Sequence, residues 1–324
     1  MTDLILEVSG LCVDFSDEPG RLRAVEDVTL SLRRGEVLGL VGESGSGKSV
    51  TGLAIMGLID RPGRIVGGSI RLEGQELVGL AEKELRRLRG RRLAMVFQDP
   101  MTTLNPVLRI ETQMVEAVRA HERVSHRAAR DRAIRTLEQV GIPSPAERIA
   151  AYPHQFSGGM RQRVAIATAL LHSPALIIAD EPTTALDVTI QSQILAEVQA
   201  LCADVGTALV WITHDLTVIA GLADRVAVMY GGKLVESGPV DAVLDHPIHP
   251  YTNGLIGSVP SRNRRGQRMT QIPGMAPMLA NFPPGCVFAP RCGRAVEPCL
   301  AAPPPLTTDG GRSWRCIRPL VEGA

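Results

Sequence analysis

A glycine-rich segment containing one lysine is the clearest chemical signal in the chain. Residues 42–49 read Gly-Glu-Ser-Gly-Ser-Gly-Lys-Ser, which fits G-x-x-x-x-G-K-[ST] between an expected strand over 36–41 and an expected helix from 49. Such a loop turns backbone N–H groups and a helix N-terminus toward the phosphates of a nucleotide. Lys48 is expected to meet the β- and γ-phosphates, and Ser49 to offer its hydroxyl to Mg²⁺. The expected nucleotide contacts in this segment are Gly42, Ser44, Gly45, Ser46, Gly47, Lys48, Ser49 and Val50.

Two adjacent acids form a second signal. Asp180 and Glu181 follow the apolar run 175–179, so we expect them at the carboxyl edge of a sheet, where α/β proteins bind ligands. Asp180 is expected to hold Mg²⁺ through water. Glu181 is expected to orient, or take a proton from, the water that attacks the γ-phosphate. Without the upstream loop, a solvated acidic turn would explain these two acids equally well.

These residues must be positioned by a parallel α/β sheet. Short continuous apolar runs at 37–41, 175–179 and 208–212 are typical of strands buried on both faces. Helical spacing of apolar residues indicates an inserted helical subdomain at about 101–170. Residues 260–324 contain 11 of the 23 prolines and four of the six cysteines. We therefore predict a first region over 1–258 and a small Pro/Cys-rich extension over 259–324.

Composition and charge argue against some classes of function. The 324 residues carry a net charge of +1, which provides no general basic field for binding nucleic acid. The basic run at 86–92 has no interleaved aromatics and is interpreted as a solvated helix end. No apolar stretch approaches the roughly 20 residues that cross a bilayer, and the acidic start differs from a secretory signal. We expect a cytoplasmic location and no nucleic-acid partner.

The order of the motifs resembles the ATP-binding cassette of ABC transporters over roughly residues 4–258. The resemblance is carried by the phosphate loop, Gln98, the segment Phe-Ser-Gly-Gly-Met over 156–160, Asp180–Glu181, Ala-Leu-Asp over 185–187, and His214. The signature segment departs from the common Leu-Ser-Gly-Gly-Gln at both ends but keeps its Ser-Gly-Gly core. The resemblance implies an ATPase with a mainly parallel sheet, an antiparallel N-terminal sheet and a helical subdomain.

The resemblance also implies roles for residues outside the loop. Two cassettes are expected to pack head to tail, so that one subunit's Ser157, Gly158, Gly159 and Asp187 face the ATP held by the other. Gln98 would contact Mg²⁺ and the attacking water, and His214 would hydrogen-bond the γ-phosphate and position Glu181. Phe15 stands where the family places an aromatic that stacks on adenine, although a core position is an alternative for a phenylalanine in a strand.

Three local strings resemble the oligopeptide and dipeptide importer branch, which also serves nickel and other small solutes. They are Gln-Asp-Pro-Met-Thr-Thr-Leu-Asn-Pro over 98–106, Tyr-Pro-His-Gln-Phe-Ser-Gly-Gly-Met over 152–160, and His-Pro-Tyr-Thr over 249–252. The implied partners are a second, paralogous cassette chain, two transmembrane permease subunits and, indirectly, an extracytoplasmic solute-binding protein. The chain would then work on the cytoplasmic side of the membrane. A soluble cassette ATPase unrelated to transport remains the alternative.

Four cysteines distinguish the extension. Cys286, Cys292, Cys299 and Cys316 could supply four thiolates to an iron–sulfur cluster or to zinc. Their spacing lacks the C-x₂-C pairs typical of zinc, and a cytoplasmic setting disfavours disulfides. The resemblance implies a [4Fe–4S] cluster, which some members of the branch hold in this extension; reduced thiols remain open. Cys12 and Cys202 are expected to be buried as small apolar residues.

Overall fold

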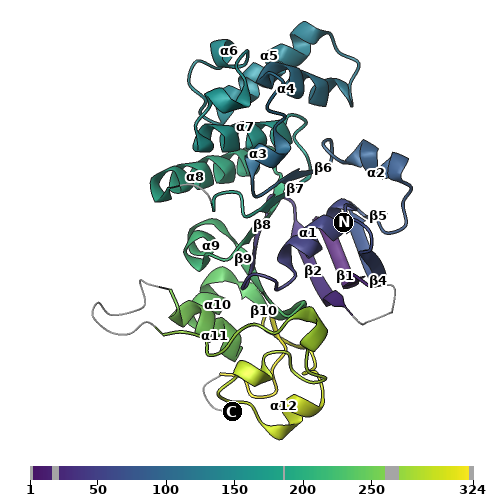
Figure 1. Cartoon of the computed structure of the whole chain (residues 1–324), viewed down its shortest axis with the longest axis vertical. Helices are drawn as coiled ribbons and strands as arrows, with labels where there is room; N and C mark the ends of the chain where they lie inside the picture. The colour runs from purple at the N-terminus through teal and green to yellow at the C-terminus, as the bar shows by residue number, and fades with distance from the viewer. Residues whose placement is uncertain (1–2, 17–21, 185–186, 260–269, 321–324) are drawn as a thin grey trace. The chain divides into compact units, whose positions relative to one another are not determined.

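The computed structural model describes residues 3–16, 22–184, 187–259 and 270–320, and these form two compact units. The first unit comprises Met1–Ile5, Arg33–Glu36 and Gly79–Val210, and the second comprises Leu6–Leu32, Val37–Val78 and Trp211–Ala324. Ala185 and Leu186, which contribute to the predicted Ala-Leu-Asp motif, lie outside the described residues. Figure 1 labels helices and strands of both units.

The second unit contains most of the strands. They are β1 (Leu4–Asp14), β2 (Arg23–Arg33), β3 (Val37–Val41), β4 (Arg64–Leu72), β5 (Gln75–Glu76), β9 (Arg225–Tyr230), β10 (Lys233–Pro239), β11 (Thr307–Asp309) and β12 (Arg312–Trp314). Its helices are α1 (Lys48–Met56), α9 (Leu216–Leu222), α10 (Val240–Asp245), α11 (Pro250–Gly257) and α12 (Glu297–Ala301), with short turns η3 (Leu279–Asn281) and η4 (Ala289–Arg291). The ends of β1 and β2 that fall at residues 4–5 and 33 count with the first unit.

Two sheets shape this unit. One has the order β2-β1-β4-β5, with β4 antiparallel to β1 and to β5. In the other, β3 pairs with β9 in parallel, and β10 runs antiparallel to β9. All five residues of β3 are buried, because the strand is covered on both faces, as its unbroken apolar sequence predicts. The antiparallel N-terminal sheet agrees with the expected α/β fold class, and the second sheet is mixed, with parallel pairing of β3 with β9 and antiparallel pairing from β9 outward.

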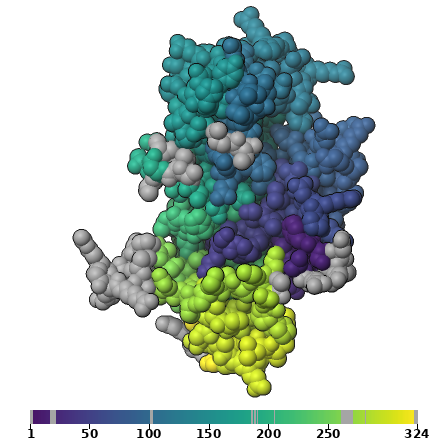
Figure 2. All heavy atoms as spheres, in the orientation of Figure 1, coloured from purple at the N-terminus to yellow at the C-terminus, as the bar shows by residue number. Residues whose placement is uncertain are grey.

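The C-terminal residues extend the second sheet. β12 pairs antiparallel with β10, joining Glu236 to Trp314 and Ser237 to Ser313, and β11 pairs with β12. Figure 1 shows this yellow segment beside β10, and Figure 2 shows the C-terminal residues as one continuous surface region. Backbone pairing therefore joins the Pro/Cys-rich extension to the strands before residue 258.

The first unit is mostly helical. Its elements are α2 (Glu82–Leu88), β6 (Leu93–Val96), α3 (Pro100–Thr103), α4 (Ile110–Arg119), α5 (His126–Gln139), α6 (Pro145–Arg148), η1 (Pro153–Gln155), α7 (Gly158–Leu170), β7 (Leu176–Asp180), α8 (Val188–Val205) and the start of β8 (Ala208–Thr213). β6 and β7 pair in parallel. Helices α4 to α7 lie together at the top of Figure 1.

Amphipathic spacing explains the helical part. On α4, Ile110, Met114, Val115 and Val118 are buried, while Arg119 is exposed. On α5, Ser125 caps the helix by accepting a hydrogen bond from the Ala128 N–H at 3.2 Å, which satisfies one of the free amides of the first turn. The basic run behaves as predicted, since Arg86 and Arg87 are exposed at the end of α2.

The two cysteines outside the extension differ in burial. Cys202 is buried in α8, as predicted, and burial raises the pKa of its thiol to about 12. For Cys12, the prediction of full burial is wrong. It is only half-buried in β1, and its sulfur accepts a hydrogen bond from the Asp27 N–H at 3.4 Å, because β1 is irregular between Ser9 and Val13.

Candidate nucleotide site

The glycine-rich loop joins β3 to α1, as its sequence predicts. Gly42 and Gly47 have φ angles of 154° and 101°. A Cβ atom on Gly42 would lie 2.2 Å from the Met229 carbonyl oxygen, and one on Gly47 would lie 2.7 Å from the Ala24 carbonyl oxygen. Glycine is therefore required at both positions, for backbone conformation and for space.

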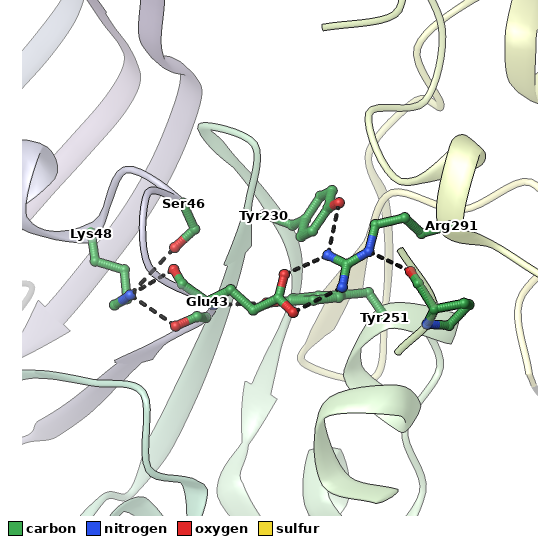
Figure 3. A network of polar contacts seen from close by, with 8 residues as sticks. Glu43, Ser46, Lys48, Tyr230, Tyr251 and Arg291 are labelled. Carbon is green, nitrogen blue, oxygen red and sulfur yellow. Dashed lines mark hydrogen bonds and ion pairs between the residues drawn. The ribbon is translucent and has the colours of Figure 1, made fainter. Parts of the chain in front are cut away.

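Lys48 points back along the loop, as Figure 3 shows. Its ammonium donates hydrogen bonds to the carbonyl oxygens of Gly42 and Glu43, at 2.8 and 3.0 Å, and lies 3.5 Å from the Ser46 hydroxyl oxygen. The side chain is buried. Ser44, Gly45 and Ser49 are exposed on the loop, while Gly47 and Val50 are half-buried. The loop therefore combines exposed residues with the buried, positively charged side chain of Lys48.

A cavity of about 520 Å³ opens beside the loop in the second unit. Its lining includes Ser44, Gly45 and Ser46 from the loop, Tyr230 from the end of β9, and residues 276–279 of the C-terminal region. Residues of the C-terminal region therefore share this cavity with the loop.

Two further predicted residues lie in the second unit. His214 is exposed directly after β8 and lines a second cavity, of about 480 Å³, with residues 215–217 and the end of α11. Phe15 is half-buried directly after β1, and its ring lies against Gly63, where a Cβ atom would come within 2.8 Å of the ring.

The acidic residues lie in the first unit, where β6 and β7 end side by side. Asp180 is the last residue of β7, and Glu181 follows it with a φ of 45°. Left-handed backbone is uncommon for a residue other than glycine and is found disproportionately at functional sites. Gln98 approaches from beyond the end of β6, where its amide nitrogen lies 3.4 Å from a Glu181 carboxylate oxygen. The Thr184 hydroxyl donates to the same oxygen at 3.1 Å.

The Ser-Gly-Gly segment forms the start of α7 in the same unit. The Ser157 hydroxyl caps the helix by accepting a hydrogen bond from the Met160 N–H at 3.3 Å. Ser157 is exposed, and Gly158 and Gly159 contribute no side chain to the first turn. This leaves an open helix N-terminus whose dipole favours an anion. Asp187 is exposed immediately before α8.

The comparisons with known proteins identify the family. The ABC transporter family matches residues 25–184, and the family described as "Oligopeptide/dipeptide transporter, C-terminal region" matches residues 235–299. The oligopeptide transport ATP-binding protein OppD of Escherichia coli K12 is 48% identical over 99% of this chain and 95% of its own length. The chain belongs to the ATP-binding cassette family of ABC transporters. A putative peptide import ATP-binding protein of Brucella melitensis is 50% identical over 97% of both chains.

Solved structures agree with this assignment. The cassette resembles a dimeric post-hydrolysis state of the ATP-binding cassette MJ0796 bound to ADP and phosphate, with a TM-score of 0.65, 26% identity and coverage of 73% of this chain and 99% of the other. It also resembles the cassette cbiO1 of Clostridium perfringens, with a TM-score of 0.64, 27% identity, and coverage of 75% and 91%. The chain is an ATPase cassette that uses ATP and, as a member of this family, Mg²⁺. None of its described helices is long and apolar enough to cross a membrane.

The four cysteines of the extension converge on one small cavity. Cys286, Cys292, Cys299 and Cys316 line it together with His249 and Phe288. Burial raises the pKa of the Cys286 thiol, and it raises that of Cys316 to about 11, with the neighbouring thiols adding to the effect. All four are free cysteines, and no cluster of three or more His, Cys, Asp or Glu side chains within the described residues has the geometry of a metal site.

Three residues outside the phosphate loop contact it, and the sequence motifs assign none of them to the nucleotide site. Arg291, Tyr230 and Tyr251 all contact Glu43, directly or through one another (Figure 3). Tyr251 stands in the string His-Pro-Tyr-Thr over 249–252, noted for its resemblance to the importer branch, and Arg291 directly precedes Cys292. The sequence contains no signal that these residues meet the loop.

Proposed function

We propose that this cassette powers the import of dipeptides or oligopeptides, working as a dimer on the cytoplasmic face of the membrane. The observation that carries the proposal is that peptide-transport relatives match nearly the whole chain, including the C-terminal region at 235–299. We further propose a second, paralogous cassette chain and two transmembrane permease subunits as partners. An extracytoplasmic binding protein would select the solute.

In the proposed ATP site, the role of each residue follows from the chemistry of its side chain. The loop amides and Lys48 hold the phosphates, with Phe15 against the adenine. Glu181 takes a proton from, or orients, the attacking water, and Gln98 and His214 position that water and the γ-phosphate. Ser49, Gln98 and Asp180 are oxygen donors of the kind that Mg²⁺ prefers, and the ion would neutralise phosphate charge.

The proposed dimer completes each site from two chains. The open N-terminus of α7, with Ser157, Gly158 and Gly159, would face the γ-phosphate bound by the other subunit, and Asp187 would lie close to it. ATP binding would then close the dimer, and hydrolysis would reopen it. We also propose that the chain divides into a cassette over 1–258 and an extension over 259–324.

For the extension, we propose that the four cysteines hold a [4Fe–4S] cluster. Four thiols lining one cavity supply the donor set that such a cluster uses, and the cluster would provide a structural link between the segments that carry them. Anaerobic purification of the full chain should give about four irons per chain and a broad visible absorption band, and Cys292→Ser should lose both. Zinc without iron, or neither metal, would contradict the cluster.

The peptide-import proposal is tested by purifying the tagged chain from its native membrane in mild detergent and identifying its partners by mass spectrometry. We expect two polytopic proteins and a second cassette chain. In the reconstituted complex, a binding protein loaded with peptide should stimulate ATP hydrolysis more than the same protein loaded with nickel. A soluble complex without membrane proteins would contradict the importer role.

A further inference from the structure

Arg291 connects the C-terminal region to the phosphate loop. It lies in η4, and its side chain is only 6% exposed. Its guanidinium holds the Glu43 carboxylate at both oxygens, with Nη1 at 2.5 Å from Oε2 and Nη2 at 3.0 Å from Oε1. A paired contact of this kind fixes both position and orientation, and is stronger than a hydrogen bond between neutral groups.

The orientation of the Arg291 side chain is itself fixed. Nε donates to the Pro273 carbonyl oxygen at 2.8 Å, and Nη1 also donates to the Tyr230 hydroxyl at 3.2 Å. The guanidinium carbon lies 5.7 Å from the centre of the Tyr230 ring. Hydrogen bonding to Glu43 raises the pKa of Arg291 above its usual value, so the group stays charged. The position and orientation of the guanidinium are therefore fixed by these contacts.

Glu43 is the second residue of the phosphate loop and is held at three points. Its carboxylate meets Arg291, its backbone N–H donates to the Tyr251 hydroxyl at 2.8 Å, and its carbonyl oxygen accepts from Lys48 at 3.0 Å. Tyr251 is fully buried, with its ring centre 4.5 Å from that of Tyr230. Figure 3 shows the continuous path from Arg291 through Glu43 to Lys48.

We propose that Arg291 is a positioning residue for ATP binding: it fixes the phosphate loop through Glu43 and neutralises a carboxylate that would otherwise repel the phosphates. The proposal rests on the assignment of residues 42–49 as the nucleotide site. Both effects act in the same direction. A preorganised loop loses less conformational freedom when ATP binds, and a paired Glu43 adds no net negative charge beside Lys48.

The experiment measures ATP affinity, turnover and thermal stability in the full-length chain, with a fluorescent ATP analogue and Mg²⁺ as the binding probe. Arg291→Met keeps the bulk of the side chain and removes its charge and hydrogen bonds. We expect it to weaken binding by about 5- to 20-fold, because it leaves the Glu43 carboxylate, whose side chain is 29% exposed, without its charged partner. Arg291→Lys should recover part of this loss, because it restores charge without the paired geometry.

A second substitution tests the route through Glu43. Glu43→Gln alone removes the carboxylate charge, and in Glu43→Gln/Arg291→Met no unpaired charge remains. If Arg291 acts through Glu43, the double variant should bind ATP within about threefold of Glu43→Gln, so that the two effects do not add. Fully additive losses would overturn the proposed route.

Arg315→Met is the matched control. Arg315 also joins the C-terminal region to a cassette strand, through a 2.6 Å ion pair with Asp27 in β2, but it does not contact the phosphate loop. It should lower stability without changing ATP affinity. Equal losses of affinity in Arg315→Met and Arg291→Met, or unchanged affinity in Arg291→Met, would overturn the proposal.

Lys48→Ala separates this inference from the nucleotide-site assignment. Loss of ATP binding in Lys48→Ala supports the assignment, and normal affinity in Arg291→Met would then contradict the role of Arg291 alone. Normal ATP binding in Lys48→Ala would instead contradict the assignment of residues 42–49.

Discussion

At the scale of single residues, Glu181 combines an uncommon backbone conformation with two close polar partners. Its φ is 45°, and one of its carboxylate oxygens lies 3.4 Å from the Gln98 amide nitrogen and 3.1 Å from the Thr184 hydroxyl. Glu181→Gln keeps the shape of the side chain and removes its ability to accept a proton. We expect turnover to fall by about 10²- to 10⁴-fold, the range for loss of a general base, while ATP still binds.

The two measurements for this variant are steady-state phosphate release and binding of a fluorescent ATP analogue. Thr184→Val, which removes only the hydroxyl that contacts Glu181, is the companion variant and should lower turnover far less. Near-normal turnover in Glu181→Gln would remove Glu181 from its proposed role.

A second residue-scale prediction concerns acid stability in the helical part. Arg132 pairs with both carboxylate oxygens of Glu122 at 2.8 Å, and His172 lies 3.0 Å from one of them. The Arg132 hydrogen bonds, followed by that of His172, lower the pKa of Glu122 from 4.5 to about 2. A lowered pKa in the folded state stabilises the protein above pH 4.5, and this contribution is lost as the pH falls toward 2.

Glu122→Gln should therefore cost stability at neutral pH and progressively less in acid. Because the pair is partly exposed, we expect a cost of no more than about 1 kcal/mol at pH 7, shrinking by pH 3. Denaturant unfolding of both proteins at several pH values measures the difference. A cost that stays constant across this range would show that the charge of Glu122 contributes nothing to stability.

The roles of single residues were easiest to predict where the interacting residues are close in sequence or occur in the order that a family motif gives. Lys48 and Glu181 could be predicted as site residues because a loop, a strand end and their spacing single them out. The Arg291–Glu43 pair could not, since the two residues are 248 positions apart and no sequence motif links the phosphate loop to the C-terminal region. Only the folding of the C-terminal region onto β9 and β10 brings them together.

At the scale of elements, α7 presents its N-terminus with almost no side chain in front of it. Gly159→Asp would place a carboxylate in the first turn, which suits the helix dipole but repels the phosphate expected from the other subunit. We predict at least a tenfold loss of turnover with unchanged ATP binding to the single chain.

The control for Gly159→Asp is a substitution that removes the cap of a neighbouring helix. Ser125→Ala removes the cap of α5 and should cost about 1 kcal/mol of stability without affecting turnover. Both variants are compared by ATPase assay and thermal unfolding. Unchanged turnover in Gly159→Asp would contradict a role for the start of α7 in the partner's site.

Strands were predictable where burial on both faces leaves an unbroken apolar run, as in β3, β7 and β8. The short C-terminal strands were not. β11 reads Thr-Thr-Asp and is exposed, and β12 reads Arg-Ser-Trp and is half-buried, so neither shows an apolar pattern. Their strand conformation is set by the pairing of β12 with β10 and of β11 with β12, a tertiary effect that local sequence does not encode.

At the scale of the whole molecule, nucleotide binding should raise thermal stability by mass action. A ligand that binds only the folded protein at 100 times its dissociation constant stabilises it by about 2.7 kcal/mol. We therefore expect ATP with Mg²⁺ to raise the melting temperature of the wild-type chain, and to leave that of Lys48→Ala unchanged. Thermal scans over a series of ATP concentrations test this. Equal shifts in both proteins would place the binding site elsewhere.

The pairing of β12 with β10 has a consequence for shortened forms of the protein. A chain ending at residue 258 would lack β12 and so open the edge of β10, where the Val235 carbonyl oxygen accepts a hydrogen bond from the Arg315 N–H at 2.9 Å. The buried carboxylate of Glu236 would also lose Arg312, which lies 2.7 Å from it. An open strand edge is a template for pairing with other chains, so such a truncation should self-associate. We therefore expect the pairing of β12 with β10 to protect this strand edge from association with other chains, and light scattering of the truncated and full-length chains would measure the difference.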